Sequence, residues 1–396
     1  MRLLIFGESV LSQTGHARVA REIADVCLSR DWDVTQVAFN HVGDKTRYKN
    51  MRIIPAQLGN SVTVYGEDIV YREYLDGEYE ALLIIQDLEV GTKWASNLAV
   101  IREQRSVVGR PYCPIFYYFP VDGPYEHDVD LVLIADTIVT HTRWGRELLR
   151  DIIPNETFER LNVIPHGTNV DVFHPLTETE RKEARKDIFF VDDEDTFVVV
   201  SVNRNSARKD LFQVMQTMAS LKRRKRVPRP FLYVHTAAID NGINLEAQTR
   251  CLGLRTKRDV LLASPGRLKW SDEELSRVYA AADCMLITAR RESWGLSVTE
   301  AMAAGCPVVA PDYGPFRQHL GDDRGFLHAP SGFIWTALDN RGPGWLTDPE
   351  AAANQIEKLH VKGFDPEPAR RYVESATWSA VGEMWADLLE NNTHGK

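Results

Sequence analysis

Short apolar or β-branched runs alternate with longer amphipathic stretches along the whole chain. The first three are the apolar run Leu3–Phe6, the amphipathic stretch Gly15–Ser29 and the apolar run Val34–Phe39. This alternation predicts βαβ units that build a parallel sheet, in which strands buried on both faces are continuous apolar runs. The pattern predicts further strands at Ala81–Ile85, Pro114–Phe119, Thr137–Thr140, Asn162–Ile164, Phe197–Val202, Phe231–His235, Val260–Leu262, Cys284–Thr288 and Pro307–Ala310.

The alternation continues over 396 residues, more than the roughly 250–300 at which a single core stops growing. We therefore expect an α/β protein with two doubly wound, Rossmann-like parallel-sheet domains. The first covers residues 1–175 and the second residues 190–375, and the charged stretch between them is predicted to form a joining helix and loop. Ligands of such sheets bind beyond the carboxyl ends of the strands, so the active site is expected in a cleft between the domains.

Composition indicates an ordinary soluble protein, with 44% hydrophobic and 26% charged residues and no apolar tract of membrane-spanning length. The run Met1–Gly7 lacks the cleavage pattern of a signal peptide and is predicted to be the first strand. The five cysteines are scattered without paired spacing, which argues against a disulfide framework or a zinc site. A reducing cytoplasm is the expected compartment.

The net charge of −9 is unevenly distributed along the chain. Residues 1–175 hold 17 Lys and Arg against 25 Asp and Glu, whereas residues 176–396 hold 30 against 31. Nucleic acid is therefore not expected as a partner, because its binding depends on neutralising phosphates. The basic run Lys222–Arg226 is predicted to be the solvated end of a helix, with contact to anionic lipid or nucleic acid as the alternative.

The segment Arg290–Ala310 carries the most specific chemistry. It follows a predicted strand and leads into a helix, with Glu292 in the loop and Glu300 two turns along that helix. Backbone N–H groups at a helix start suit a phosphate, and carboxylates suit sugar hydroxyls. The alternative is a pair of exposed carboxylates beside a buried Ala-rich helix.

This segment resembles the Glu-x7-Glu signature of the retaining GT-B glycosyltransferases of family four, also called glycosyl transferases group 1. The resemblance implies the GT-B architecture, in which two Rossmann-like domains face a cleft. Residues 1–175 are then expected to bind the acceptor and residues 190–375 the nucleotide sugar, while a closing helix within residues 376–396 returns to the first domain. It also implies that Glu292 contacts the donor sugar and Glu300 the nucleotide ribose. The donor-binding residues that it implies in the loop between them are Ser293, Trp294, Gly295 and Leu296.

A second segment, Val198–Asp210, is predicted to be a strand, a loop with three cations and the start of a helix. Arg204 and Lys209 resemble the pair of cations that clamps the donor diphosphate in this family, and Arg208 is a nearby extra. Asn203 of the same loop is also expected to contact the donor. Two cations on a diphosphate offset the charge that builds as the glycosidic bond breaks. A solvated basic loop is the alternative.

Two further stretches extend the resemblance. The loop that opens the first long helix is similar to the family's Gly-rich loop and implies a phosphate contact for Gly15, although its spacing is not a dinucleotide fingerprint. The stretch Ser264–Leu268 resembles the base-contacting loop and implies donor contacts for Arg267 and Leu268.

The chain departs from the family where many members carry a His-Asp pair. It reads Tyr-Tyr-Phe-Pro-Val-Asp-Gly-Pro there, so that Asp122 aligns with the second member and the histidine is missing. Asp122 is expected to be a catalytic residue of the cleft, with a turn-forming Asp before Gly as the alternative. The histidines nearest to the expected cleft are His127, His141 and His166, each as a structural residue or as a substitute for the missing one.

The resemblance implies transfer of a hexose-type sugar from a nucleotide diphosphate sugar with retention of configuration, through a front-face route in which the donor phosphate takes the acceptor proton. Neither a metal nor a cofactor is expected, because Arg and Lys supply the positive charge; the spacing Asp128-Val129-Asp130 is discounted as a metal site. The favoured acceptor is a sugar, a glycolipid or another small molecule. The alternatives are a nucleotide-sugar epimerase or hydrolase and a non-catalytic sugar-nucleotide-binding protein. The segment Ser331–Gly344 is interpreted as an insertion without an assigned role.

Overall fold

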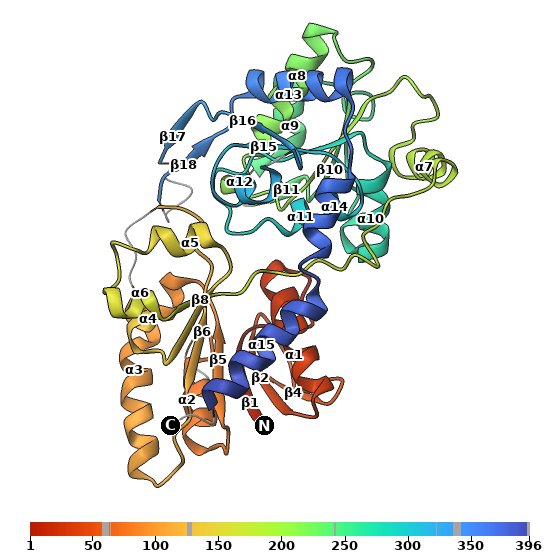
Figure 1. Cartoon of the computed structure of the whole chain (residues 1–396). Coiled ribbons are helices and arrows are strands. Elements are labelled where there is room, and N and C mark those ends of the chain that lie inside the picture. Colours follow the sequence, from red (N-terminus) through yellow and green to blue (C-terminus); the bar gives the residue numbers. More distant parts are fainter. Residues whose placement is uncertain are drawn as a thin grey trace. The chain divides into compact units, whose positions relative to one another are not determined.

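A computed structural model describes residues 1–57, 63, 65–124, 129–240, 243–321, 323–335 and 342–393. The chain divides by its contacts into two compact units (Figure 1). The first unit consists of Met1–Val121, Glu126–Gly167 and Trp378–Lys396, and the second of Asp122–Tyr125 and Thr168–Thr377. Each unit is built on a parallel sheet, which confirms the predicted fold class.

The first unit holds an eight-stranded sheet of order β3-β4-β2-β1-β5-β6-β7-β8, parallel except for β3. Its strands are β1 (Arg2–Glu8), β2 (Asp33–Phe39), β3 (Thr46–Tyr48), β4 (Met51–Pro55), β5 (Ala81–Ile85), β6 (Ile115–Tyr118), β7 (Thr137–Thr140) and β8 (Leu161–Val163). Its helices are α1 (Gly15–Ser29), α2 (Glu67–Asp76), α3 (Leu88–Val107), α4 (Asp130–Ile134), α5 (Arg143–Leu148), α6 (Asn155–Glu159) and α15 (Trp378–Thr393).

The second unit holds a six-stranded parallel sheet of order β13-β10-β9-β14-β15-β16. Its strands are β9 (Val198–Val202), β10 (Phe231–His235), β13 (Val260–Leu262), β14 (Cys284–Leu286), β15 (Val308–Pro311) and β16 (Phe326–His328), with two hairpins, β11 (Ile239–Asp240) with β12 (Ile243–Asn244) and β17 (Gly332–Ile334) with β18 (Gly344–Leu346). Its α-helices are α7 (Glu178–Ala184), α8 (Leu211–Arg224), α9 (Leu245–Cys251), α10 (Asp272–Ala281), α11 (Leu296–Ala303), α12 (Gly314–Leu320), α13 (Pro349–Lys362) and α14 (Glu367–Glu374).

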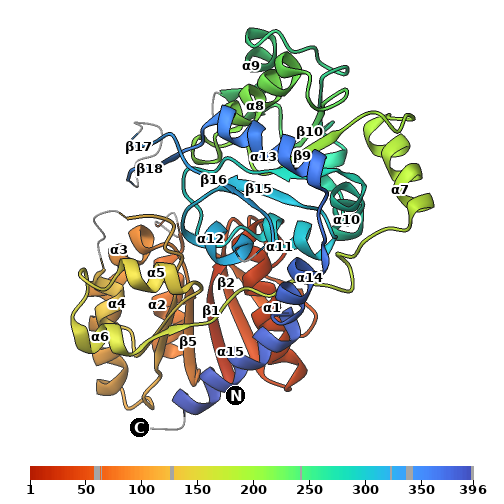
Figure 2. The same cartoon turned by 45° about the horizontal axis from the view of Figure 1, so that its top comes forward.

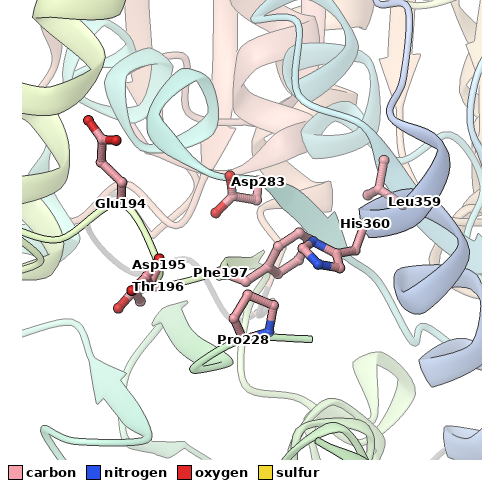
Figure 3. A pocket seen from close by; sticks show the side chains of 8 residues that line it. All are labelled: Glu194, Asp195, Thr196, Phe197, Pro228, Asp283, Leu359 and His360. Atoms are coloured by element: carbon pink, nitrogen blue, oxygen red, sulfur yellow. The ribbon is translucent and has the colours of Figure 1, made fainter. Parts of the chain in front are cut away.

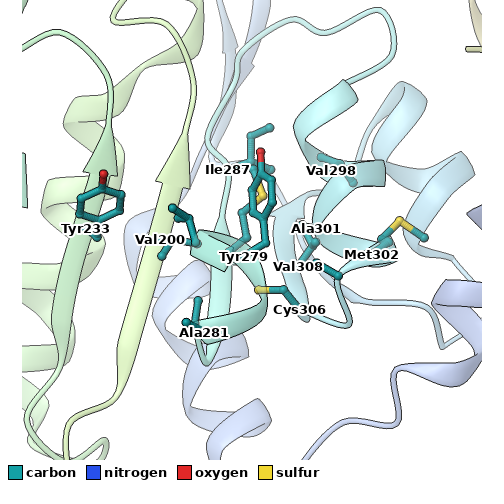
Figure 4. Close-up of a cluster of buried hydrophobic side chains, with 14 of the residues drawn as sticks. Val200, Tyr233, Tyr279, Ala281, Ile287, Val298, Ala301, Met302, Cys306 and Val308 are labelled. Atoms are coloured by element: carbon teal, nitrogen blue, oxygen red, sulfur yellow. The ribbon is translucent and has the colours of Figure 1, made fainter. Parts of the chain in front are cut away.

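Both faces of the second unit's sheet are apolar. Val198 and Val200 of β9 belong to one buried cluster, whereas Val199 between them belongs to another. Successive side chains of a strand point to opposite faces, so the alternation covers both sides of the sheet. The first cluster includes Tyr279 of α10 and Met302 of α11 (Figure 4). Packing on this face therefore fixes the position of α11.

The predicted joining segment between residues 175 and 190 is part of the second unit. Phe173, Ala184, Ile188 and Phe189 are all buried in its core, and the Arg185 guanidinium lies 3.0 Å from the Asp283 carboxylate. The main segment of this unit begins at Thr168, so the predicted domain bounds differ from the observed ones at this point. The difference arises because the polar face of α7 dominates the local sequence, while its few apolar residues are enough to anchor it.

Helix α15 packs in the first unit, as Figure 1 and Figure 2 both show it alongside α1. It buries Val381, Trp385 and Leu389. Arg30, at the end of α1, forms ion pairs with three carboxylates of α15, those of Glu383, Asp387 and Glu390. Buried apolar residues and the ion pairs with Arg30 thus hold the last helix in this unit.

The basic run at the end of α8 is paired within the second unit. Lys222 Nζ lies 2.6 Å from Asp259, and Arg223 lies 2.6 Å from Glu350 of α13. Glu357 of α13 accepts from both Arg224 and Arg226, at 3.2 and 3.1 Å. Four of the five cations of the run are thus paired with carboxylates, which favours the predicted helix end over a contact with a polyanion.

All five cysteines lie in the described part of the chain and are free thiols, four of them buried. Among the described residues, no helix combines the length and apolarity that crossing a bilayer requires.

Candidate functional site

The candidate site lies where the strand order of the second unit reverses. Strands β9 and β14 are neighbours at the centre of the sheet, and the chain continues from them toward opposite edges. Such a switch point leaves a crevice at the carboxyl ends of the two strands, where ligands of doubly wound sheets bind. The loops that begin there are residues 203–210 after β9 and residues 287–295 after β14. They hold the predicted Lys209 and Glu292.

These two loops are tied together by hydrogen bonds. Arg290 N donates to Arg208 O at 2.7 Å, and Arg208 Nη1 donates to Arg291 O at 3.0 Å. Thr288 Oγ1 donates to Asp210 O at 2.9 Å, and the Asp210 carboxylate lies 2.8 Å from Arg290 Nε. Mutual bonding of this kind pre-organises the loops, so that little order has to be gained when a ligand binds.

Lys209 and Glu292 form a buried ion pair at the centre of the two loops. Their side chains are only 11% and 7% exposed, and Arg208 Nη1 lies 3.7 Å from Glu292 Oε1. Burial alone would raise the pKa of Glu292, but the Lys209 ammonium and the Arg208 guanidinium outweigh it and hold that pKa below its usual value. Glu292 is therefore a carboxylate in the folded protein, and two cations converge on it.

The loop after Glu292 leads into α11 through a left-handed turn. Gly295 has φ +87° and is the N-cap of α11, a conformation that favours glycine. Trp294 before it is buried, and its carbonyl accepts a hydrogen bond from His319 Nε2 at 3.0 Å. Ser293 and Leu296, the other predicted donor residues of this loop, are half-buried. The backbone between Glu292 and the helix start is thus fixed by burial.

Glu300 is also buried, at 8% exposure, on α11. Its Oε2 accepts a hydrogen bond from Tyr279 Oη at 3.0 Å. Because Glu292 is equally buried, the alternative of two exposed carboxylates is wrong for both residues. A buried carboxylate has to be hydrogen-bonded or charge-paired, and both of these satisfy that condition.

Arg204, predicted to share the diphosphate with Lys209, points elsewhere. Its side chain is 69% exposed and pairs with Asp240 of β11 at 2.8 Å. Asn205 beside it is buried and donates to the carbonyl of Ile243 at 3.1 Å, which ties this part of the loop to the small hairpin. Asn203 is half-buried in the same loop. The second cation at Glu292 is therefore Arg208, which the sequence indicated only as an extra.

Asp122 lies in the second unit, beside the loop that carries Glu292. Its Oδ2 is 4.0 Å from Nη2 of Arg291, whose side chain is fully buried. The other carboxylate oxygen, Oδ1, is buried and accepts no hydrogen bond from any residue that the structure describes. The sequence did not indicate that Arg291 lies at the site. Arg290 and Arg291 are adjacent residues of the same type, and only the folded structure shows which of them is fully buried beside Asp122.

The remaining predicted donor residues lie in other loops. Gly15 is the first residue of α1, which begins beyond the carboxyl end of β1 in the first unit. Arg267 and Leu268 follow β13, two strands away from β9. Arg267 Nη1 donates to the Ile188 carbonyl at 2.6 Å, so it braces the segment after α7, and Leu268 packs at the edge of the core. Their donor contacts stay predictions.

Three histidines were considered as replacements for the missing histidine of the family's His-Asp pair. His127 lies outside the described residues, as does Asp128 of the discounted metal spacing. His141 and His166 are buried in the first unit, and both lie within hydrogen-bonding distance of Tyr118 Oη. His166 also stacks on Trp378 of α15. These contacts favour the structural interpretation for His141 and His166.

A separate hollow of about 300 Å³ lies at the opposite ends of the strands (Figure 3). Phe197 and Asp283 among its lining residues directly precede β9 and β14, so the hollow lies at the amino ends. Ligands of parallel sheets bind at the carboxyl ends, and Asp283 is already occupied by Arg185 and the Val198 backbone. The candidate site therefore does not include it.

Acid is expected to destabilise the loop before α11 through His319. Burial lowers the pKa of His319 from 6.5 to about 4, so the folded protein resists a proton that the unfolded chain accepts. The resulting stability is complete above pH 6.5 and is lost as the pH falls toward 4, by about 3 kcal/mol in full. Urea unfolding at pH 7.5 and 4.5 should show a smaller acid loss in His319→Gln than in the wild type.

The control for this prediction is the exposed histidine His174. His174→Gln should keep the acid sensitivity of the wild type. Arg324, whose Nε donates to the His319 carbonyl, is present in the wild type and in both variants, so it does not contribute to a difference between them. An equal loss of stability in the wild type and His319→Gln would exclude this histidine as the acid-sensitive group.

Comparison with protein families gives a match in the second unit. Residues 181–360 match the family model described as glycosyl transferases group 1. The matched range contains Lys209, Glu292 and Glu300. This match confirms the resemblance that those residues predicted.

The sequence is also similar to curated proteins of known activity. It is 26% identical to the mannosylfructose-phosphate synthase of Agrobacterium fabrum over 211 residues, which make up 52% of this chain and 44% of that protein. It is 25% identical to the D-inositol 3-phosphate glycosyltransferase of Corynebacterium urealyticum over 236 residues, 58% of this chain and 51% of that protein. The chain spans about half the length of the curated relatives it matches.

Solved structures share the fold. The sucrose-phosphate synthase of Thermosynechococcus elongatus matches with a TM-score of 0.74 and 17% identity over 100% of both chains. HepE of Anabaena, solved in complex with UDP-glucose, matches with a TM-score of 0.72 and 16% identity over 99% of this chain and 100% of that chain. The predicted GT-B fold is thereby confirmed.

Proposed function

Because residues 181–360 belong to the glycosyl transferases group 1 family, we propose that this protein transfers a hexose-type sugar from a nucleotide diphosphate sugar to an acceptor, with retention of configuration. The observation that carries the proposal is the convergence of Lys209 and Arg208 on Glu292 at the switch point of the second unit. Cations and a carboxylate side by side in a buried crevice match the two halves of such a donor, a diphosphate and a polyhydroxylated sugar.

In this proposal the cations stabilise the leaving group. Lys209 and Arg208 are held at the site before the donor arrives, and they offset the negative charge that accumulates on the diphosphate as the glycosidic bond breaks. Their two positive charges do the work that a divalent metal does in other transferases. The proposed reaction therefore needs no metal and no cofactor beyond the donor itself.

The two carboxylates position the donor. Glu292 is ionised and accepts hydrogen bonds from sugar hydroxyl groups, with the Lys209 ammonium beside it for the diphosphate. Glu300, oriented by the Tyr279 hydroxyl, accepts from the ribose. Asp122 Oδ1 is available to a hydroxyl of the sugar or of the acceptor. HepE, which shares the fold, binds UDP-glucose and supports a donor of this class.

The donor site is tested by thermal unfolding of the purified protein with UDP, GDP, ADP and CMP and their sugar conjugates. One nucleotide diphosphate should raise the melting temperature of the wild type, because a ligand at 100 times its Kd adds about 2.7 kcal/mol of stability. Glu300→Ala should lose most of that rise. Glu357→Ala removes a carboxylate of similar burial, 9% against 8%, outside the site, and should keep the rise.

Product analysis then separates transfer from its alternatives. Release of nucleotide that depends on an added acceptor supports a transferase, whereas release to water or a change in the sugar supports a hydrolase or an epimerase. The proposal is wrong if no nucleotide stabilises the protein at millimolar concentration.

The two arginines of the first loop are expected to differ in their effect on nucleotide binding. Arg208→Met should weaken binding at least about tenfold, because a hydrogen bond from a charged group contributes about 1.5–3 kcal/mol. Arg204→Met should weaken it less than about fivefold, because an exposed, screened ion pair contributes at most about 1 kcal/mol. Calorimetric titration with the stabilising nucleotide measures the affinity of both variants. A larger loss of affinity in Arg204→Met than in Arg208→Met would show that Arg204, not Arg208, binds the diphosphate with Lys209.

A further inference from the structure

Aromatic side chains on the hairpin of β17 and β18 are the feature that the proposed reaction leaves unused. Phe333 is 49% exposed and Trp335, directly after β17, is 64% exposed. Large aromatic side chains usually bury most of their surface, and they contribute strongly to binding when they meet a ligand. Two of them exposed on one short hairpin therefore form a candidate binding surface.

The hairpin is attached to the loop that carries Glu292. Trp345 N of β18 donates to the Arg290 carbonyl at 2.9 Å. A Cβ on Gly344 would lie 2.9 Å from both Cβ and the carbonyl oxygen of Arg290, so only glycine permits this approach. Tyr313 Oη donates to the Ala289 carbonyl at 2.7 Å, one residue earlier in the same loop. The hairpin and the donor loop therefore form one structure.

Three rings form a ladder from this loop to the surface. The rings of Tyr313 and Trp345 are stacked, with centroids 4.4 Å apart and an interplanar angle of 7°. Phe333 stands opposite Trp345 in the strand register, with centroids 4.9 Å apart. Exposure rises from 3% at Tyr313 through the half-buried Trp345 to 49% at Phe333. The ladder thus joins the candidate site to a solvent-facing aromatic surface.

We propose that Phe333 and Trp335 form a binding platform for a sugar ring of a carbohydrate acceptor, next to the donor loop. A pyranose has a face of C–H groups that packs on an aromatic ring, while its hydroxyl groups stay in water, which matches rings that are only half covered. The inference rests on the proposed transferase function and goes beyond it by naming the acceptor class as a carbohydrate.

The charge of the hairpin favours a sugar over a membrane surface. The strands and their flanks, residues 331–335 and 342–346, contain neither Lys nor Arg, and the sequence between them adds one residue of each sign, Asp339 and Arg341. Peripheral membrane contacts of this kind combine aromatic with basic residues, because the lipid surface is anionic. A hairpin with no net charge and no basic cluster, attached to the donor loop, suits a neutral polyhydroxylated ligand.

The platform is tested by saturation-transfer NMR with free maltotriose, cellobiose and methyl α-mannoside at millimolar concentration, in the presence of the nucleotide that stabilises the protein. At least one saccharide should receive saturation on its C–H protons from the wild type. Phe333→Ala and Trp335→Ala should weaken its binding about tenfold, the loss expected when one stacked ring is removed. Tyr112→Ala, which removes an aromatic ring of the same 49% exposure from the first unit, should not.

The melting-temperature rise caused by the nucleotide should be unchanged in Phe333→Ala and Trp335→Ala, which shows that both fold and keep the donor site. The platform is refuted if no saccharide receives saturation, or if the signal persists in both variants, even where the nucleotide result supports the transferase. It is also refuted if the wild type instead cosediments with vesicles of phosphatidylcholine and phosphatidylglycerol in a Trp335-dependent way. Failure of the nucleotide arm alone refutes the transferase function.

Discussion

Lys209→Met is expected to lower the rate of sugar transfer about a thousandfold and the free energy of unfolding by about 3–5 kcal/mol. Both effects come from the same ion pair. Removing Lys209 takes away a cation for the leaving diphosphate and leaves the Glu292 carboxylate, 7% exposed, without its nearest partner. Arg208 at 3.7 Å compensates only partly. Steady-state kinetics and urea unfolding measure the two losses.

The double variant Lys209→Met/Glu292→Leu separates the loss of transfer rate from the loss of stability. Replacing both partners by apolar side chains removes the uncompensated charge, so most of the stability should return while transfer stays at least about a thousandfold slower than in the wild type. Lys222→Met, which breaks a more exposed ion pair with Asp259, is the control and should keep full activity. Recovery of transfer in the double variant would exclude Lys209 and Glu292 from the chemistry.

The same pair gives the stability a defined pH dependence. The pKa of Glu292 lies below 4.5 in the folded protein, so its contribution is complete above pH 4.5 and is lost as the pH falls through the folded value. The difference in unfolding free energy between the wild type and Lys209→Met/Glu292→Leu should therefore shift in favour of the variant below pH 4.5. A constant difference down to pH 3 would contradict an ionised Glu292.

Asp122→Asn is expected to lower turnover about a hundredfold while the melting-temperature rise caused by the nucleotide stays unchanged. Asp122 lies beside the Glu292 loop, 4.0 Å from the buried Arg291 guanidinium, and its Oδ1 accepts no hydrogen bond from the described residues. The substitution keeps size and shape and removes the negative charge. Initial rates at saturating donor and acceptor, with nucleotide binding as the second readout, measure the effect.

This substitution also tests the turn interpretation of Asp122. Asn forms the same side-chain turn before glycine as Asp does, so a purely structural role predicts full activity in Asp122→Asn. Asp122→Ala, which removes both charge and turn, should then be no slower than Asp122→Asn if the charge is what matters. Full activity in Asp122→Asn would show that the residue serves the turn alone.

Strands buried on both faces could be predicted with accuracy, whereas edge strands were predicted only where they are apolar. Ala81–Ile85 and Phe231–His235 are observed with the predicted bounds, because burial on both faces requires a continuous apolar run. The edge strand Val260–Leu262 was also predicted, because all three of its residues are apolar. Strand β3 (Thr46–Tyr48) was not predicted, because an edge strand of mostly exposed residues needs no such run. Its place comes from pairing with β4, which the sequence does not show.

The candidate site was predicted in part. Lys209, Glu292 and Glu300 follow from a motif in which residue type and spacing along a strand, loop and helix are local properties. Arg204 and Arg208 differ only in where the loop directs them, and the fold turns the first toward Asp240 and the second toward Glu292. A long, flexible side chain takes its partner from the surrounding structure.

The sequence by itself determined the α/β class, several buried strands and the family resemblance, since periodicity and local spacing express them; the donor contacts of the motif residues stay predictions. Only the tertiary structure decided that the segment after Thr168 belongs to the second unit, that Arg291 is buried beside Asp122, and that Trp345 joins the Arg290 loop to the exposed Phe333. Each of these depends on contacts between residues far apart in the chain, whose burial and charge balance exist only after the sheet and its loops are assembled.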